Sequence, residues 1–158
     1  MKAIVAVDRN WGIGRDGDQL VYLSEDLRRF KALTLDHAVI LGRRTLATFP
    51  GGRPLPRRRN LILSRDPGFC CPGAEVFPSV EALQAAAPED AFVIGGGSIY
   101  RALLPLCDTV YVTEIDAEYP ADTFFPDLSR DAEWQAEPED GEQVQDGVRY
   151  RYVTYRRR

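Results

Sequence analysis

The stretch Ala91-Phe92-Val93-Ile94-Gly95-Gly96-Gly97-Ser98-Ile99-Tyr100-Arg101-Ala102-Leu103-Leu104-Pro105 decides the fold, because it joins an apolar strand, three glycines and a helical pattern. Phe92-Val93-Ile94 is apolar on both faces, which is typical of a central strand in a mostly parallel sheet. Without Cβ atoms, the glycines let a ligand approach the main chain closely, and the helix start after them offers free N–H groups to an anion. Ligands of open α/β sheets bind at the carboxyl ends of strands, where this turn lies. The alternative is a tight strand-to-helix turn that binds nothing.

Composition predicts one domain, residues 1–158. At 158 residues and 44% hydrophobic content, the chain buries about 70% of its unfolded surface on folding, enough for a core without staples. Three cysteines, of which Cys70 and Cys71 are adjacent, make a poor disulfide framework and favour a reducing compartment. The apolar start of the chain turns polar at Asp8, too early for a signal peptide or a membrane span, so we expect a cytoplasmic protein without a membrane partner.

Charge and histidine content narrow the class of ligand. The formal net charge of −4 disfavours general nucleic-acid binding, whereas local arginine clusters favour small anionic ligands. A single histidine, His37, and scattered cysteines provide no metal-ligand spacing, so no metal is expected. We read His37 as a surface residue and Cys107 as a packed one.

The remaining chain predicts an α/β fold with helices flanking the sheet. Expected strands cover residues 2–7, 38–41, 60–63, 76–77 and 109–115, and the expected helices cover residues 24–34 and 79–87. The last two strands, around Trp134 and over residues 150–155, lack a helix between them and predict an antiparallel hairpin at a sheet edge.

Residues 8–23 read as a long loop, and we interpret this loop as a lid because it mixes glycines with apolar side chains. Residues 12–17 match the dinucleotide pattern G-x-G-x-x-G. We reject that match, because the pattern must follow a strand directly and open a helix, whereas Asp8-Arg9-Asn10-Trp11 intervenes here.

One acidic side chain lies on an apolar helix face. At about 100° per residue, Asp26 shares a face with Leu27, Phe30, Leu33 and Thr34, in a helix that we expect Ser24 to cap. Burial of this carboxyl would raise its pKa, which is typical of a functional acid. A first-turn aspartate favoured only by the helix dipole is the alternative.

The chain lacks the usual catalytic motifs. It has no P-loop, no G-x-S-x-G elbow and no nucleophile paired with a base. The chain offers one acid and an anion site sized for a nucleotide. We therefore expect a bound cofactor to supply the reactive group, and a nicotinamide cofactor fits such a site.

Six segments together resemble dihydrofolate reductase in their order and spacing. They are Asp8-Arg9-Asn10-Trp11-Gly12-Ile13-Gly14, Ser24-Glu25-Asp26-Leu27-Arg28-Arg29-Phe30, Ile40-Leu41-Gly42-Arg43-Arg44-Thr45, Arg53-Pro54-Leu55-Pro56 with Arg58, Val93-Ile94-Gly95-Gly96-Gly97-Ser98-Ile99-Tyr100, and Tyr111-Val112-Thr113-Glu114-Ile115 with Asp122. The resemblance runs nearly end to end. It implies a cytoplasmic, monomeric oxidoreductase of one-carbon metabolism that reduces 7,8-dihydrofolate to tetrahydrofolate with NADPH and binds antifolate-type molecules. It also implies three layers with a mostly parallel eight-stranded sheet.

The resemblance further implies site roles. Asp26 is implied as the acid that promotes protonation of the pterin imine, with Thr113 bonded to it. The implied substrate residues are Ile4, Val5, Asp26, Leu27, Phe30, Phe49, Arg58, Ile94, Tyr100 and Thr113. The implied cofactor residues are Ala6, Ile13, Gly14, Gly42, Arg43, Arg44, Thr45, Leu63, Ser64, Arg65, Gly95, Gly96, Gly97, Ser98 and Ile99. The family carries a cis peptide bond between the first two glycines.

The sequence departs from the family where most members have Pro-Trp before the acid-bearing helix, since this chain has Leu20-Val21. Ala121 also replaces a common glycine beside Asp122. Two rival functions therefore stay open: an NADPH-linked pyrimidine reductase of riboflavin synthesis, and a nucleotide-binding or folate-binding module without catalysis. The positions of Asp26 and Arg58 argue against the pyrimidine reductase.

Overall fold

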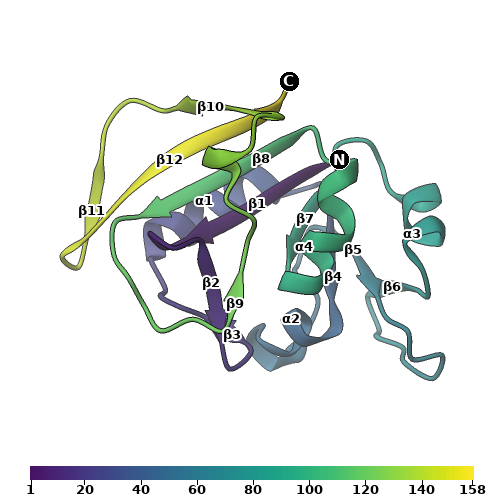
Figure 1. Cartoon of the computed structure of the whole chain (residues 1–158). Helices are drawn as coiled ribbons and strands as arrows, with labels where there is room; N and C mark the ends of the chain where they lie inside the picture. Colours follow the sequence, from purple (N-terminus) through teal and green to yellow (C-terminus); the bar gives the residue numbers. More distant parts are fainter.

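A single large sheet forms the centre of the computed structural model, which describes all residues 1–158 (Figure 1). Across this sheet the strands follow the order β10 (Trp134–Pro138), β12 (Val148–Arg157), β8 (Thr109–Ile115), β1 (Lys2–Val7), β7 (Phe92–Gly95), β4 (Ala38–Gly42), β5 (Arg59–Leu63) and β6 (Ala74–Phe77). A short strand, β11 (Gln143–Gln145), also pairs with β12. The expected central strand is confirmed, because β7 lies between β1 and β4 and is parallel to both.

The sheet is parallel except at one edge. Strand β1 is parallel to β8, and β5 is parallel to both β4 and β6. Strand β12 is antiparallel to β8 on one side and to β10 on the other. The mostly parallel eight-stranded sheet with an antiparallel edge hairpin is therefore confirmed, with β11 as an addition.

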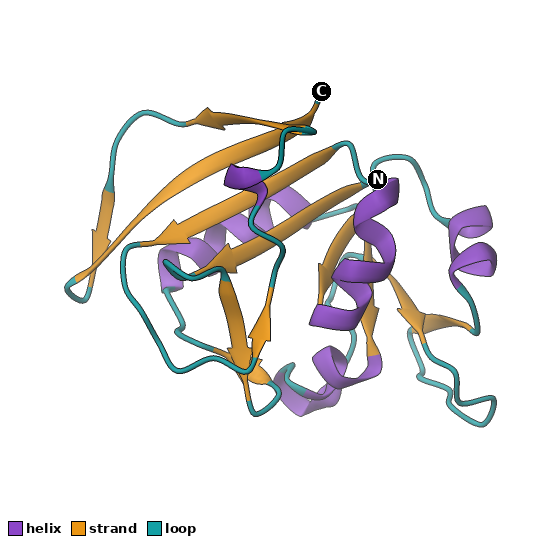
Figure 2. Ribbon diagram, in the orientation of Figure 1, coloured by secondary structure: helices purple, strands orange, loops and turns teal.

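Helices cover both faces of the sheet (Figure 2). One hydrophobic cluster joins Val5 and Ile40 to α3 (Val80–Ala86) and α4 (Gly97–Leu103), through Leu83 and Leu103. A second cluster holds the side chains that alternate with these, such as Val39, and packs them against α1 (Ser24–Thr34) and α2 (Arg43–Ala47). Because neighbouring strand residues point to opposite faces, this split produces the predicted three layers. Short 3-10 turns cover Pro50–Gly52, Leu104–Leu106 and Leu128–Arg130.

The prediction of an unstructured loop over residues 8–23 is wrong. Strands β2 (Gly12–Arg15) and β3 (Asp18–Gln19) form a hairpin there, and β2 also pairs with β9 (Thr123–Phe124) from the second predicted loop. The turn residues Asp16 and Gly17 have φ of 52° and 82°, as a type I′ hairpin turn requires. The strands are too short for apolar alternation to reveal them in the sequence.

Smaller expectations have mixed outcomes. Cys107 is buried and Cys70 exposed, and all the cysteines are free. His37 is half-buried rather than a plain surface residue, because its ring packs edge-on against Phe92 with centroids 5.5 Å apart. No helix combines the length and the apolar character that crossing a membrane requires.

Candidate active site

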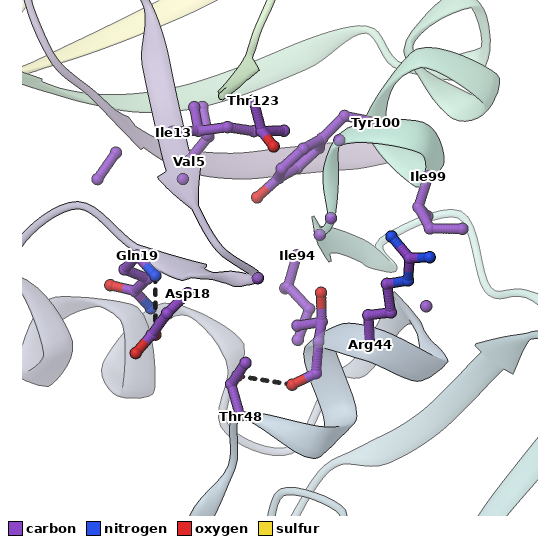
Figure 3. A pocket seen from close by; sticks show the side chains of 18 of the residues that line it. Val5, Ile13, Asp18, Gln19, Arg44, Thr48, Ile94, Ile99, Tyr100 and Thr123 are labelled. Atoms are coloured by element: carbon purple, nitrogen blue, oxygen red, sulfur yellow. Dashed lines mark hydrogen bonds between the residues drawn. The ribbon is translucent and has the colours of Figure 1, made fainter. Parts of the chain in front are cut away.

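A cavity of about 1690 Å³ lies at the carboxyl ends of β1, β4, β5 and β7, with residues of α1, α2 and α4 in its wall (Figure 3). Every residue assigned above to the catalytic, substrate or cofactor set lines it. The topology therefore brings together the ends of parallel strands that are far apart in the sequence, as expected for open α/β sheets.

Asp26 lies in this cavity in the first turn of α1. Its carboxylate Oδ1 accepts a hydrogen bond of 2.6 Å from the hydroxyl of Thr113, which is buried on β8. Burial raises the pKa of Asp26, while the bond from Thr113 and the charge of Arg29 lower it by less. The carboxyl thus holds a proton at higher pH than an exposed aspartate does.

The N-terminus of α1 is not capped by Ser24, so that prediction is wrong. Leu23 occupies the cap position without a side-chain bond, and Ser24 is already helical. Instead, the side-chain amide of Gln145 on β11 accepts from the backbone N–H of Glu25 at 3.2 Å and donates to the Ser24 hydroxyl. A residue distant in sequence therefore fixes the helix turn that carries Asp26.

Tyr100 of α4 crosses the cavity toward β1. Its hydroxyl donates a 2.7 Å hydrogen bond to the backbone carbonyl of Ile4, and burial raises the pKa of Tyr100, so the phenol stays neutral. In Figure 3, Val5, Ile94 and Tyr100 surround the same space. This end of the cavity is apolar, with a few fixed carbonyl groups.

The glycine turn lies between α2 and α4, and the peptide bond Gly95–Gly96 is cis, as the resemblance implied. Gly95 has φ of +138°, which favours glycine. A Cβ atom at either residue would stand 3.3 Å from the Thr45 hydroxyl. The main chain of this turn is therefore open to the cavity and closely backed by α2.

Alanine at Gly97 tests how closely β9 covers this turn. A Cβ atom there would lie 2.5 Å from the methyl group of Thr123, so the two segments must separate. We expect Gly97→Ala to lower the free energy of unfolding by about 1–3 kcal/mol, measured by urea denaturation. Adding Thr123→Ser removes the methyl group and should restore most of the loss; no rescue would contradict the proposed contact.

Cationic groups gather after β4 and β5. Arg43 pairs with Asp66 at 2.9 Å, and its guanidinium carbon lies 4.3 Å from the centroid of the Phe69 ring. Arg44, Ser64 and Arg65 complete this part of the wall, and Figure 3 shows Arg44 on the side of Ile99. Several guanidinium groups, a hydroxyl and the start of α2 form a donor set that suits a phosphate group.

Arg58 lies at the opposite end of the cavity from Ser64. Arg58 precedes β5 and Ser64 follows it, and the five residues of this strand span roughly 17 Å. Its guanidinium donates to the Thr34 hydroxyl at 3.1 Å and to the Pro56 carbonyl at 3.0 Å. Burial lowers the pKa of Arg58, which nevertheless stays charged. These bonds hold a cation in the wall of the cavity.

The hairpin of β2 and β3 and the segment before β9 close the remaining side of the cavity. The carboxylate of Asp122 accepts from the Asp16 backbone N–H at 2.8 Å, which joins the second loop to the hairpin turn. The Asp8 carboxylate, almost fully buried, accepts from the backbone N–H groups of Gly12 at 2.8 Å and Tyr119 at 3.0 Å. Both carboxylates therefore hold the hairpin of β2 and β3 over the cavity.

Some lining residues were not among the predicted site residues. They are Asp8, Gln19, Leu20, Val21, Tyr22, Lys31, Thr48 and Thr123, among others. An Asp-Gly pair at a two-residue turn was the one signal for the hairpin that carries Gln19 to the cavity. Nothing in the local sequence around Asp8 indicates its bond to Tyr119, since the partners are far apart in the chain.

Comparisons with known proteins agree on one family. The sequence profile described as "Dihydrofolate reductase" matches residues 1–157. The chain is 46% identical to dihydrofolate reductase type 3 of Salmonella typhimurium over 126 residues, covering 78% of this chain and 76% of that one. It is 38% identical to dihydrofolate reductase of Neisseria meningitidis serogroup B over 156 residues, covering 98% and 96%. A solved structure, "Dihydrofolate reductase from Enterococcus faecalis complexed with NADP(H)and RAB-propyl", is 34% identical, has a TM-score of 0.83 and covers 99% of this chain and 95% of its own.

Proposed function

The chain belongs to the dihydrofolate reductase family and reduces 7,8-dihydrofolate to 5,6,7,8-tetrahydrofolate with NADPH, and we propose that Asp26 is the acid on which this reaction depends. The observation that carries the proposal is the Asp26 carboxyl in the cavity, bonded to Thr113 and shielded enough for its pKa to rise. The family match favours this activity over the pyrimidine reductase and over a module without catalysis.

The acid's task follows from the chemistry of the substrate. Reduction of the pterin imine adds a hydride to the ring carbon and a proton to the ring nitrogen, and NADPH supplies the hydride when bound. Asp26 binds the amino group and ring nitrogen of the pterin and raises the basicity of the imine, so that the nitrogen accepts its proton. Thr113 keeps the Asp26 carboxyl in one orientation. Shielding from water strengthens these interactions.

The substrate lies along α1 in this proposal. Leu27, Phe30 and Phe49, which line the cavity, sandwich the pterin and benzoyl rings. The backbone carbonyls of Ile4 and Ile94 face the pterin, while Tyr100 holds the former carbonyl in place. Arg58 binds the glutamate α-carboxylate. The spread of these residues from β1 to the end of α1 supports an elongated ligand.

The cofactor occupies the other half of the cavity in this proposal. Ala6 and Ile13 flank the nicotinamide, and the main chain of Gly95, Gly96 and Gly97 lies under the pyrophosphate. The 2′-phosphate meets Arg43, Arg44, Ser64 and Arg65, whose donors fit a dianion.

Selectivity for NADPH over NADH tests the phosphate site. We expect Arg44→Gln to weaken NADPH binding roughly tenfold, because one charge-assisted contact is lost. NADH binding should change little, since that cofactor has no 2′-phosphate. Fluorescence titration measures both affinities, with Arg130→Gln on an exposed turn as the control. An equal loss for the two cofactors would place the phosphate elsewhere.

The direct test of function is oxidation of NADPH with dihydrofolate at neutral pH, followed by the loss of nicotinamide absorbance. We expect turnover that ceases on omission of either substrate and is blocked by antifolate compounds. Folded protein that binds NADPH yet produces no tetrahydrofolate would contradict the activity.

We further propose that the protein is one domain and works as a monomer in a reducing compartment such as the cytoplasm. The residues implied for substrate and cofactor all line one cavity, so the proposed site needs no second copy of the chain, and the three cysteines are free. Both observations support the proposal.

A further inference from the structure

Arg29 is an unusual arginine beside the acid. It lies one helical turn after Asp26 on α1, and its side chain is 19% exposed. Every other ion-paired arginine of the chain has a side chain that is at least 30% exposed. A long cationic side chain loses rotamer freedom and hydration when it is confined in this way, so the site must hold it firmly.

Two contacts confine Arg29. Its guanidinium carbon lies 3.8 Å from the centroid of the Tyr152 ring, and Nη2 lies 2.9 Å from the Glu139 carboxylate. Planar stacking and a short ion pair together fix the orientation of the guanidinium. The contacts come from the C-terminal edge of the sheet, a part of the chain that has no other proposed role in catalysis.

The sheet register places these contacts directly behind the acid. Tyr152 on β12 stands opposite Thr113 on β8, the residue that bonds Asp26. The backbone N–H of Glu139 donates to the carbonyl of Tyr152 at 2.9 Å, so the two anchors of Arg29 are joined to each other. The edge hairpin is thus connected to Asp26 along two routes, through Thr113 and through Arg29.

We propose that Arg29 is a positioning residue that sets the ionisation of the Asp26 carboxyl, and that Tyr152 and Glu139 hold it there. The proposal deepens the proposed function, since its effect on the reaction rests on Asp26 being the acid. Arg29 itself has no proposed contact with dihydrofolate or NADPH.

The charges around Asp26 support this role. Burial raises the pKa of Asp26, and the hydrogen bond from Thr113 and then the charge of Arg29 lower it by less. The other groups that face the acid are not cations: Thr113 on β8, and Tyr150 and Tyr152 on β12. Burial and the nearby Asp26 charge raise the pKa of Tyr152 to about 12, so this phenol stays neutral. Glu25 on α1 pairs with the exposed Arg28, and Glu139 pairs with Arg29.

The segment before α1 places no polar side chain at Val21 that could bind the Asp26 carboxyl. Val21 stands where the family usually has tryptophan, and it packs in the small cluster of Leu23, Ile115 and Tyr150. An aliphatic side chain cannot donate a hydrogen bond to the carboxyl. Arg29, on the same helix, is therefore the positive charge that acts on Asp26, beside the hydrogen bond from Thr113.

Titration of Asp26 by carbon-13 NMR, in protein without ligands, tests the proposal separately from activity. We expect Arg29→Gln to move the titration of Asp26 upward by about half a unit to one unit of pH, because a confined positive charge is lost. Arg29→Lys keeps the charge and should restore most of the shift. Arg28→Gln is the matched control, since Arg28 is exposed on the same helix.

Tyr152→Leu provides a second variant that leaves Arg29 in place. It removes the ring under the guanidinium and should raise the Asp26 titration by a smaller amount, whereas Tyr152→Phe keeps the ring and should not. Near-unchanged NADPH affinity confirms that each variant is folded.

Each outcome separates this proposal from the function of Asp26. An unchanged Asp26 titration in Arg29→Gln overturns the proposal, as does an equal shift in Arg29→Lys, which would indicate lost packing rather than lost charge. A titration that shifts in Arg29→Gln and is mostly restored in Arg29→Lys supports the proposal. If the titration moves while the pH profile of hydride transfer stays in place, the role of Arg29 stands and the assignment of Asp26 as the acid fails.

Discussion

Asp26→Asn is expected to slow hydride transfer at pH 7 by at least about a hundredfold, the lower end of what a positioned general acid contributes. The amide still accepts the hydroxyl bond of Thr113, so the geometry of the cavity survives while the ionisable group is lost. Stopped-flow measurement of NADPH oxidation in a single turnover isolates the chemical step. Asp140→Asn, an exposed change, is the control. Full activity of Asp26→Asn would remove this carboxyl from the mechanism.

The same substitution should stabilise the folded protein at pH 7. Because burial raises the pKa of Asp26 above its value in the unfolded chain, the folded state binds the proton more tightly. The free energy of unfolding that Asp26 contributes therefore falls as pH rises from the unfolded value through the folded one. Above that window the charged carboxyl opposes folding, and asparagine removes the penalty. Urea denaturation should show Asp26→Asn to be more stable at pH 7, and a less stable variant would contradict the burial cost.

Arg58→Gln is expected to raise the KM for dihydrofolate by about ten- to 150-fold. A bidentate pair between guanidinium and carboxylate contributes about 1.5 to 3 kcal/mol, and glutamine can offer only a neutral contact. The kcat should change much less, because the glutamate tail lies far from the reacting ring and its binding is uniform through the reaction.

Arg57→Gln is a closely matched control for Arg58. The neighbouring arginine pairs with Asp36 on the surface, and both of these side chains are more than half exposed. We expect the KM of Arg57→Gln for dihydrofolate to stay within about twofold of the parent value, as for most surface substitutions. If the two variants weaken substrate binding equally, general positive charge and not the geometry of Arg58 attracts the carboxylate.

Most of the fold could be predicted from the apolar runs and the glycines of the sequence. Phe92-Val93-Ile94 and the glycines after it predict the central strand and the ligand turn, because burial on both faces and a missing Cβ leave local traces. The hairpin at Asp16-Gly17 was missed, since its strands have only four and two residues, and the second partner of β2 is β9, which is remote in the chain. Long-range pairing of this kind has no local signature.

The site also contains residues that could be predicted from the sequence and residues that depend on long-range contacts. The helical wheel places Asp26 on the apolar face, and the family resemblance implies Thr113 as its partner, so both partners of the central hydrogen bond could be predicted as site residues. The residues that hold Asp26 and Arg29 in place could not be predicted. Gln145 holds the start of α1, and Tyr152 with Glu139 confines Arg29, through contacts between residues more than 100 positions apart.

The most direct test of the account is the pH dependence of single-turnover hydride transfer in the parent enzyme and in Asp26→Asn. We predict that the parent rate falls as pH rises, because a smaller fraction of the bound imine is then protonated. The Asp26→Asn rate should approach the parent rate toward acid pH, where solvent protonates the imine without help. A ratio of the two rates that stays constant across the pH range would contradict the claim that the Asp26 carboxyl promotes this protonation.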